Sequence, residues 1–276
     1  MKTRIIVSVI SVPLLFAMIF LLPLWALGIF IATVSALASY ELLNCALPKP
    51  RKRFYAYAAA TGIAQSAGFS LGGRGLLTIL PAFLLMLVSA CELIISLQKD
   101  SDENRLGFSD ILVLLFAGLI LPVMLSSILR IGRRENDPFF LLLPFLATFA
   151  SDSGAYFAGT FLGKHKLIPK VSPSKTVEGS VGGFVCTISL LLLYGLLLVQ
   201  FGYTVNFPAL GIYAFLGSAA CQIGDLFFSA LKRGSGIKDY GSLIPGHGGV
   251  LDRFDGMHFA APVIEFLLFW FSAISK

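Results

Sequence analysis

A polar, glycine-rich stretch from Ser229 to Asp255 lies between two long apolar runs and contains many side chains that can bind anions. Its charged and imidazole-bearing residues are Lys232, Arg233, Lys238, Asp239, His247, Asp252, Arg253 and Asp255. Arginine grips a phosphate bidentately, and lysine acts as a point charge. Gly248 and Gly249 leave backbone N–H groups free to approach a phosphate closely. The stretch therefore predicts a site for a phosphate-bearing ligand, with an ordinary basic loop as the alternative.

Three aspartates in and beside this stretch predict a second kind of chemistry. Asp252 and Asp255 share one face if the final helix begins near them, and Asp225 approaches from the preceding apolar run. Converging carboxylates repel one another unless a cation neutralises them, and an all-oxygen set of ligands suits Mg²⁺ or Mn²⁺. We therefore predict a site for Mg²⁺ or Mn²⁺ on these three aspartates. The alternative is a solvated cluster in which Asp252 caps the helix and pairs with Arg253 or Lys232.

A second polar segment, Gly163 to Gly179, also contains basic residues that could contact phosphates. Its lysines are Lys164, Lys166, Lys170 and Lys175. Just before it, Asp152 lies inside the apolar run Phe139–Leu162, where a carboxylate is costly unless it is paired, hydrated or bound to an ion. Asp152 is a candidate site residue, with a hydrogen-bonded structural carboxylate as the alternative. Phosphoryl and nucleotidyl transfer need a metal and cations around the phosphorus, so the two segments together favour such a transfer.

Two common nucleotide-binding motifs are absent from the sequence. Gly159 to His165 reads GTFLGKH, which has neither the spacing nor the ending of a P-loop, and no GxGxxG motif follows a strand. A lone histidine is more often structural than catalytic, but the glycines beside His247 leave it accessible. A nucleotide bound at this site would therefore be held by residues other than a P-loop or a GxGxxG motif.

The elements that position these residues are long apolar runs. The chain of 276 residues is 57% hydrophobic and only 13% charged, which is well outside the range of soluble domains. The runs are Ile5–Leu22, Leu24–Leu43, Phe54–Leu71, Leu76–Leu97, Phe108–Leu129, Phe139–Leu162, Gly182–Phe201, Phe207–Leu231 and Met257–Ile274. Each approaches the roughly 20 residues that cross a bilayer as a helix. We predict an all-α, polytopic integral membrane protein of about nine transmembrane helices.

The predicted organisation is a single polytopic membrane domain, 1–276. Within it, residues 1–135 form N-terminal helices, and residues 136–276 form the catalytic helices and cytoplasmic loops. A signal peptide is an alternative reading of the first run, but apolar character resumes after Pro23 and favours two spanning helices. The four cysteines show no CxxC pairing and are predicted to be packing residues.

The basic residues fit the charge pattern of a membrane protein. The net charge of +6 comes from short clusters at the ends of apolar runs, as cytoplasmic loops require, so no nucleic-acid partner is predicted. With the N-terminus inside, both polar segments face the cytoplasm. The cluster from Arg130 to Arg134 is the one conflict, because strict alternation would put it outside.

The polar stretch resembles the signature of the phosphatidate cytidylyltransferase (CDP-diacylglycerol synthase) family. It reads S-x-L-K-R-x4-K-D-x-G-x2-I-P-x-H-G-G-x2-D-R-x-D and matches at every position. Three further segments are similar to that family: DSGAY at Asp152 to Tyr156, SPSKTVEG at Ser172 to Gly179, and QIGD at Gln222 to Asp225. This similarity covers roughly the last 130 residues, whereas the N-terminal helices match only in being apolar.

The resemblance implies an enzyme that makes CDP-diacylglycerol and pyrophosphate from CTP and phosphatidate with Mg²⁺. It also implies an all-helical membrane fold, a homodimer, and an active site open to the cytoplasm. The compact length of the chain favours a bacterial inner membrane. Asp225 and Asp252 would bind the metal, with Asp255 as a third or supporting carboxylate. Residues assigned to substrate or its phosphates are Asp152, Ser172, Lys175, Glu178, Lys232, Arg233, Lys238, Gly248, Gly249 and Arg253. Asp239 and His247 would orient the loop, contact cytosine or ribose, or assist proton transfer.

Rival functions are distinguishable by experiment. A CTP-dependent lipid kinase similar to dolichol kinase would transfer the γ-phosphoryl group instead of CMP. A CDP-alcohol phosphotransferase is disfavoured because its aspartate pattern is absent; Asp255 to Ala260 reads DGMHFA. A transporter would use Asp152 and Asp225 to line an ion path, but the polar residues gather at one end of the runs.

Overall fold

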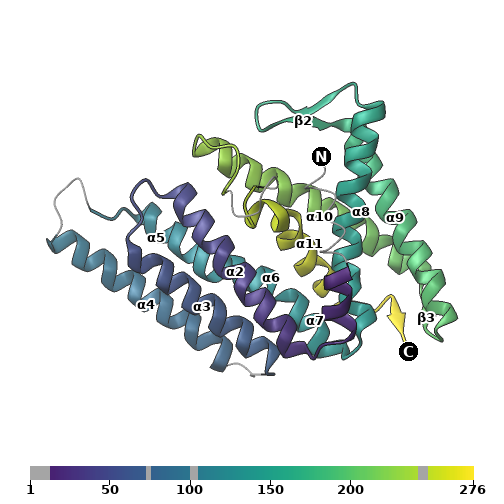
Figure 1. Ribbon diagram of the computed structural model, residues 1–276, viewed down its shortest axis with the longest axis horizontal. Helices are drawn as coiled ribbons and strands as arrows, with labels where there is room; N and C mark the ends of the chain where they lie inside the picture. Colours follow the sequence, from purple (N-terminus) through teal and green to yellow (C-terminus); the bar gives the residue numbers. More distant parts are fainter. Residues whose placement is uncertain (1–12, 73–75, 100–104, 242–247) are drawn as a thin grey trace. The chain divides into compact units, whose positions relative to one another are not determined.

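The computed structural model describes residues 13–72, 76–99, 105–241 and 248–276. Helices dominate this part of the chain, as predicted for an all-α protein, and two short two-stranded sheets accompany them (Figure 1). Two compact units are present: Met1–Arg133 with Ile237–Arg253, and Arg134–Gly236 with Phe254–Lys276. His247 and the first part of the apolar run Ile5–Leu22 lie outside the described residues. The single domain 1–276 stays a prediction.

In the first unit, α2 (Leu24–Ala46) packs on α3 (Lys52–Ser70), and α3 packs on α4 (Leu76–Lys99) (Figure 1). These helices follow the predicted apolar runs closely. The weakly hydrophobic α3 buries polar residues such as Gln65 and Ser66 within the unit. It therefore packs inside the helix bundle, as its small and polar residues predict.

The next run forms one helical stretch with a change of winding in its middle. It comprises α5 (Phe108–Leu115), the π-helical turn η2 (Phe116–Ile120), α6 (Leu121–Leu125) and α7 (Ser127–Glu135). Pro122 at the start of α6 lacks a backbone N–H, so regular helical bonding cannot continue through it. The Ala117 carbonyl in the π-turn accepts a hydrogen bond from the Ser39 hydroxyl of α2 at 2.5 Å. The irregular turn is thereby satisfied from a neighbouring helix.

The arginine cluster lies in α7 and is bound to protein groups. The Arg130 guanidinium donates to the Val123 carbonyl at 3.0 Å and to the Ser127 hydroxyl at 2.7 Å, and it lies 4.7 Å from the Phe69 ring centroid. Arg134 pairs with Glu135 at 3.4 Å. Arg130 therefore contributes to packing, whereas Arg133 and Arg134 are exposed, and the conflict with the rule that positive charge faces inward applies to these two.

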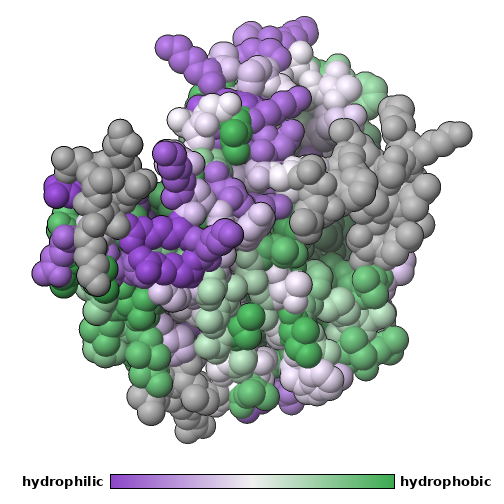
Figure 2. Space-filling model, turned by 60° about the vertical axis from the view of Figure 1, so that its left-hand side comes forward, coloured by the Kyte–Doolittle hydropathy of each residue, from purple (hydrophilic) through white to green (hydrophobic). Residues whose placement is uncertain are grey.

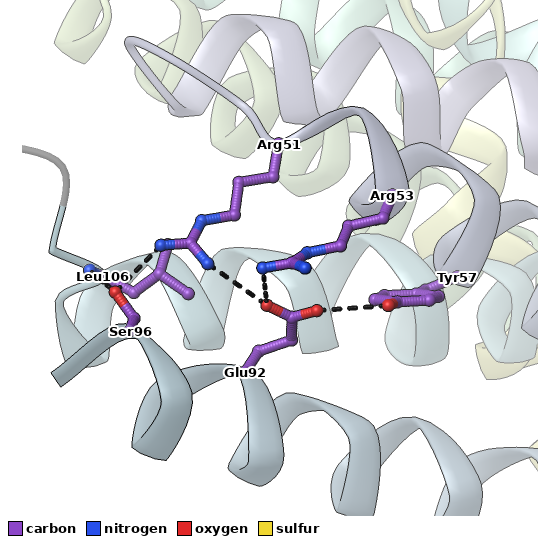
Figure 3. Close-up of polar contacts among 6 residues, drawn as sticks. All are labelled: Arg51, Arg53, Tyr57, Glu92, Ser96 and Leu106. Carbon is purple, nitrogen blue, oxygen red and sulfur yellow. Dashed lines mark hydrogen bonds and ion pairs between the residues drawn. The ribbon is translucent and has the colours of Figure 1, made fainter. Parts of the chain in front are cut away.

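A buried carboxylate joins α3 to α4 (Figure 3). Glu92 of α4 is 5% exposed and pairs with Arg53 and, at 3.3 Å, with Arg51. Its other oxygen accepts from the Tyr57 hydroxyl at 3.1 Å. Arg51 also donates to the Ser96 hydroxyl at 2.9 Å. The cluster satisfies a charge that would otherwise be costly to bury.

In the second unit, α8 (Pro138–Leu162), α9 (Val177–Gln200) and α10 (Phe207–Gly234) pack against one another (Figure 1). A Cβ on Gly154 would lie 2.6 Å from the Gly182 carbonyl, so the backbones of α8 and α9 approach at glycine. The Thr176 hydroxyl caps α9 by accepting from Gly179 N–H at 3.1 Å. This threonine belongs to the SPSKT segment, so the segment and α9 are positioned together.

The polar segment Gly163 to Gly179, predicted as a loop, contains an antiparallel hairpin. Its strands are β1 (Lys166–Ile168) and β2 (Ser172–Thr176), joined by a turn in which Val171 N–H donates to Ile168 O at 3.2 Å. A strand this short carries no periodic signal in the sequence, which explains why the pattern did not reveal it. A second pair, β3 (Thr204–Val205) and β4 (Ile274–Ser275), joins the start of α10 to the end of the chain.

The final helix, α11 (Leu251–Trp270), begins before the predicted run at Met257. Asp252 lies in its first turn, and Asp255 follows at a spacing of three. The helix that follows the signature stretch therefore begins near Asp252 and Asp255, as their placement on one helix face requires.

Six helices among the described residues are long and apolar enough to cross a membrane. They are Leu24–Ala46, Thr78–Gln98, Phe108–Glu135, Pro138–Leu162, Val177–Gln200 and Phe207–Gly234. Green hydrophobic residues cover much of the lower part of the face seen in Figure 2. Large apolar side chains of α4, such as Phe83 and Met86, are exposed. The chain is a multi-pass membrane protein, and the count of nine crossings stays a prediction.

Candidate functional site

Asp225 of α10 forms the central ion pair of the second unit. Its Oδ2 lies 2.6 Å from the Lys175 ammonium on β2, and its Oδ1 accepts from the Ser229 hydroxyl at 3.3 Å. Both side chains of the ion pair are half-buried, with 24% of Lys175 and 31% of Asp225 exposed. The structure thus joins the SPSKT segment to the helix that leads into the signature stretch. Sequence reasoning selected both residues but did not pair them.

The basic end of α10 also contacts the hairpin. The Arg233 guanidinium donates to the Val171 carbonyl, in the turn between β1 and β2, at 3.3 Å. Lys232, beside it in sequence, is buried and interacts electrostatically with Asp255 of α11. Two predicted basic residues therefore lie at the hairpin end of α10, together with the lysines of the hairpin itself.

Two carboxylates of the second unit, Asp225 and Asp152, lie within electrostatic range of a third, Asp255. Asp255 interacts with Asp225 and with Asp152 of α8, and Lys232 supplies an opposing charge. Asp152 accepts a weak hydrogen bond from the Cys221 thiol at 3.5 Å. Asp152 was predicted to contact substrate and not metal, so its interaction with Asp255 is a finding of the structure.

Gln222 of the QIGD segment belongs to a hydrogen-bond network that connects α8, α9 and α10. Its amide donates to the Ser218 hydroxyl and the Ser180 carbonyl, each at 3.2 Å, and its carbonyl accepts from the Ser180 hydroxyl. Ser218 in turn shares a hydrogen bond with Ser151 of α8 at 2.9 Å. This network fixes α8, α9 and α10 relative to one another where Asp152 and Asp225 are attached.

Glu178, predicted to contact substrate, holds the base of the hairpin. Its Oε2 accepts the backbone N–H of Lys164 at 3.1 Å and of His165 at 3.2 Å, and its Oε1 lies 2.6 Å from His165 Nδ1. Ser172 opens β2 and is half-buried. Glu178 therefore supports the strand that contains Lys175, and a direct substrate contact of Glu178 or Ser172 stays a prediction.

In the first unit, Asp252 organises the end of the signature stretch. Its Oδ2 accepts the backbone N–H of Tyr240 and of Gly249, each at 2.9 Å. A Cβ on Gly248, which has φ +81, would lie 3.0 Å from that oxygen. The N–H of Gly249 is therefore donated within the loop. Asp252 lies in the first turn of α11 and binds N–H groups that precede the helix, so its predicted helix-capping role and the phosphate-binding role of Gly248 and Gly249 stay predictions.

Glu41 of α2 is the residue that sequence reasoning missed. It is 4% exposed, and its two oxygens accept the backbone N–H groups of Val250 at 2.9 Å and Leu251 at 2.8 Å. An acidic residue inside an apolar run was the available signal, and the same rule had selected Asp152.

The remaining predicted residues of the signature lie at the surface. Lys238, Asp239 and Arg253 are exposed, and His247 is outside the described residues. Asp239 is close to Gly248, because a Cβ on that glycine would lie 3.7 Å from the Asp239 Cβ. Their exposure leaves them accessible to a soluble polyanion.

Carboxylate oxygens on Asp225 and Asp255 are suitable ligands for Mg²⁺ by type. Among the residues that the structure describes, however, no group of three His, Cys, Asp or Glu side chains is arranged to hold a metal ion. One oxygen of Asp225 is instead paired with Lys175. A set of three aspartate ligands therefore stays a prediction.

Comparison with known proteins covers nearly the whole chain. The model of the "Cytidylyltransferase family" matches residues 2–271. A phosphatidate cytidylyltransferase of Staphylococcus haemolyticus (strain JCSC1435) is 32% identical over 272 residues, covering 97% of this chain and 99% of that protein. A protein of the same name from Staphylococcus aureus (strain COL) is 32% identical over 278 residues, with the same two coverages. One from Staphylococcus saprophyticus is 37% identical over 167 residues, covering 60% of this chain and 62% of that protein.

The family model and the two alignments that cover 97% of the chain include the N-terminal helices, which contain none of the signature segments. They also include the hairpin with Lys175, the α10 helix with Asp225, and the start of α11 with Asp252. The chain belongs to the cytidylyltransferase family.

Proposed function

We propose that the chain is a phosphatidate cytidylyltransferase, which transfers CMP from CTP to phosphatidate and releases CDP-diacylglycerol and pyrophosphate. The observation that carries this function is the similarity, over 97% of the chain, to relatives with that name. The multi-pass helical fold supports it, because phosphatidate is held in the bilayer. The grouped basic and acidic side chains at the hairpin end of α10 support it further.

The reaction requires little covalent work from the protein. A phosphatidate oxygen attacks the α-phosphorus of CTP, the bond from that phosphorus to the bridging oxygen breaks, and pyrophosphate leaves with the electron pair. The protein must hold two polyanions in line and offset their mutual repulsion. Lysine and arginine side chains supply that offset, and no proton has to be removed from an ionised phosphate oxygen.

Lys175 is the first phosphate ligand that we assign. Its ammonium pairs with Asp225, so its charge is held at the hairpin. Arg233 braces the hairpin turn through the Val171 carbonyl and is the second side chain that we assign to phosphate. Lys238 and Arg253 are exposed and would bind the outer phosphates of CTP.

Mg²⁺ is proposed as the cofactor, bound by Asp225, Asp252 and Asp255. When bound, it neutralises phosphate charge and favours departure of pyrophosphate. The oxygen-only donor set supports this choice over a transition metal that prefers nitrogen or sulfur. Asp225, which pairs with Lys175, would supply a carboxylate to the metal, and Lys175 would bind phosphate beside it.

The orientation that we propose places the active site on the cytoplasmic side of a bacterial inner membrane. The supporting observation is that Arg233 at the end of α10 contacts the lysine-rich hairpin, so two basic segments share one end of the second unit. Positive charge collects on the cytoplasmic side of membrane proteins. A homodimer is proposed from the family resemblance alone.

The proposed function is tested with purified protein in detergent micelles that contain phosphatidate. With CTP labelled on the α-phosphorus, the label is expected to enter the lipid phase as CDP-diacylglycerol. A CTP-dependent lipid kinase would leave the label in CDP, and a transporter would show no CTP-dependent labelling of lipid. Either of these results would refute the assignment.

A further inference from the structure

We infer that Glu41, far from the signature stretch in sequence, is a positioning residue that fixes the start of α11 for catalysis. The inference rests on the proposed function and adds to it a residue that lies outside every signature segment. Glu41 belongs to α2 (Leu24–Ala46), and the groups that it binds belong to the same compact unit.

The cost of burying Glu41 indicates what it does. A carboxylate that is 4% exposed inside an apolar helix is expensive unless strong donors compensate it. The donors are the backbone N–H groups of Val250 and Leu251, at 2.9 and 2.8 Å. Leu251 is the first residue of α11, where helical N–H groups lack a partner within the helix and the helix dipole favours negative charge. Glu41 and the helix start therefore satisfy one another.

Glycines allow this carboxylate to approach the loop. A Cβ on Gly249 would lie 2.5 Å from Glu41 Oε2, and a Cβ on Gly241 would lie 2.8 Å from Oε1. Both distances are too short for a side chain unless the Glu41 carboxylate moves, so glycine at these two positions leaves room for Glu41 to reach the loop. Part of the glycine-rich character of the signature stretch is thus explained by a residue of another helix.

The contact also orients the aspartate that the proposed mechanism needs. Asp252 follows Leu251 directly, and its Oδ2 accepts from Gly249 and Tyr240. Glu41 thus binds Val250 and Leu251, while Asp252 binds the residue before them. The two carboxylates together hold four backbone N–H groups, which fixes the direction in which Asp252 and Arg253 leave the loop. Glu41 touches no substrate in this arrangement and acts through the loop.

The test compares Glu41→Gln with Glu92→Gln, a matched change at a second buried carboxylate. Glu92 is 5% exposed and binds arginines of α3, away from the signature loop. Hydrogen exchange is measured by mass spectrometry on peptides that contain Val250 and Leu251, and kcat and KM for CTP are measured on the same preparations. For Glu41→Gln, we expect exchange at these amides to rise by roughly tenfold or more, because a neutral amide is a weaker acceptor. We expect kcat to fall by roughly tenfold with KM changed less than about threefold, because misalignment affects the transition state most.

Glu92→Gln is expected to leave exchange at Val250 and Leu251 unchanged. Unchanged exchange there in Glu41→Gln would overturn the contact, and raised exchange with normal kcat would overturn the positioning role. If Glu41→Gln does not fold, Gly241→Ala perturbs the same carboxylate without removing its charge, and the same two readouts apply. Exchange does not depend on cytidylyl transfer, so a failure of the proposed function would show as inactive wild-type protein with this exchange pattern intact.

Discussion

The ion pair between Lys175 and Asp225 is expected to stabilise the substrate-free protein and to weaken when CTP binds. The perturbation is a double-mutant cycle with Lys175→Gln, Asp225→Asn and both changes together. At a separation of 2.6 Å between the charged atoms, and with charge centres about 4 Å apart, an effective dielectric constant of ~20 gives about 4 kcal/mol. The two side chains are 24% and 31% exposed, so solvent screening lowers the expected coupling to about 1 to 2 kcal/mol.

Thermal unfolding in detergent measures this coupling, with a shift of roughly 2 to 6 °C expected for each single change. A saturating concentration of CTP should reduce the coupling to below about 0.5 kcal/mol, because the lysine then binds phosphate. If the effects of the two single changes on stability are additive without CTP, the ion pair contributes no net free energy to folding. A coupling that CTP leaves unchanged would refute the assignment of Lys175 to substrate.

Four further outcomes are expected. Asp252→Asn should abolish CTP-dependent transfer while the protein stays folded in detergent; near-normal activity would contradict its proposed role. Gly249→Ala should lower stability by about 1 to 3 kcal/mol and should not be additive with Glu41→Gln, which a double-mutant cycle of melting temperatures checks. Chelation of divalent ions should stop transfer, and Mg²⁺ should restore it in a radiolabel assay. Tyr203 is buried and donates a hydrogen bond to Asp137 at 2.5 Å; burial, and then this bond, raise the pKa of Tyr203 to about 12. The stability that Tyr203 contributes should therefore be lost as the pH rises from about 10 to 12. Tyr203→Phe should remove that loss from a plot of melting temperature against pH.

Much of the fold was predictable because an apolar run of about 20 residues crosses a membrane as an α-helix, which satisfies its own backbone hydrogen bonds. The runs Leu24–Leu43 and Leu76–Leu97 became α2 and α4 with nearly the predicted ends. The π-helical turn at Phe116–Ile120 was not predicted, because the pattern of apolar residues does not distinguish a π-helical turn from regular α-helix. The hairpin at Lys166–Thr176 was missed because its strands are too short to show a period.

The candidate site divides in the same way. Residue type and local spacing selected Asp225, Asp252 and Lys175, because charges next to apolar runs stand out in the sequence. Pairings between distant segments were not accessible, since nothing in a local pattern connects Lys175 with Asp225. Glu41 is the extreme case, because Val250 lies 209 residues away and offers only backbone groups. A backbone donor leaves no trace in residue type.

The cluster around Glu92 has a consequence for how the chain is made. Arg51 and Arg53 leave the ribosome before Glu92, so their positive charges are uncompensated while the first helices are being inserted. At that stage they can orient the helix pair on either side of Pro50, as loop charges do. Once α4 is in place, Glu92 binds both arginines, and its single negative charge offsets one of their two positive charges. The same two side chains therefore direct insertion early in biogenesis and hold α3 to α4 in the finished protein.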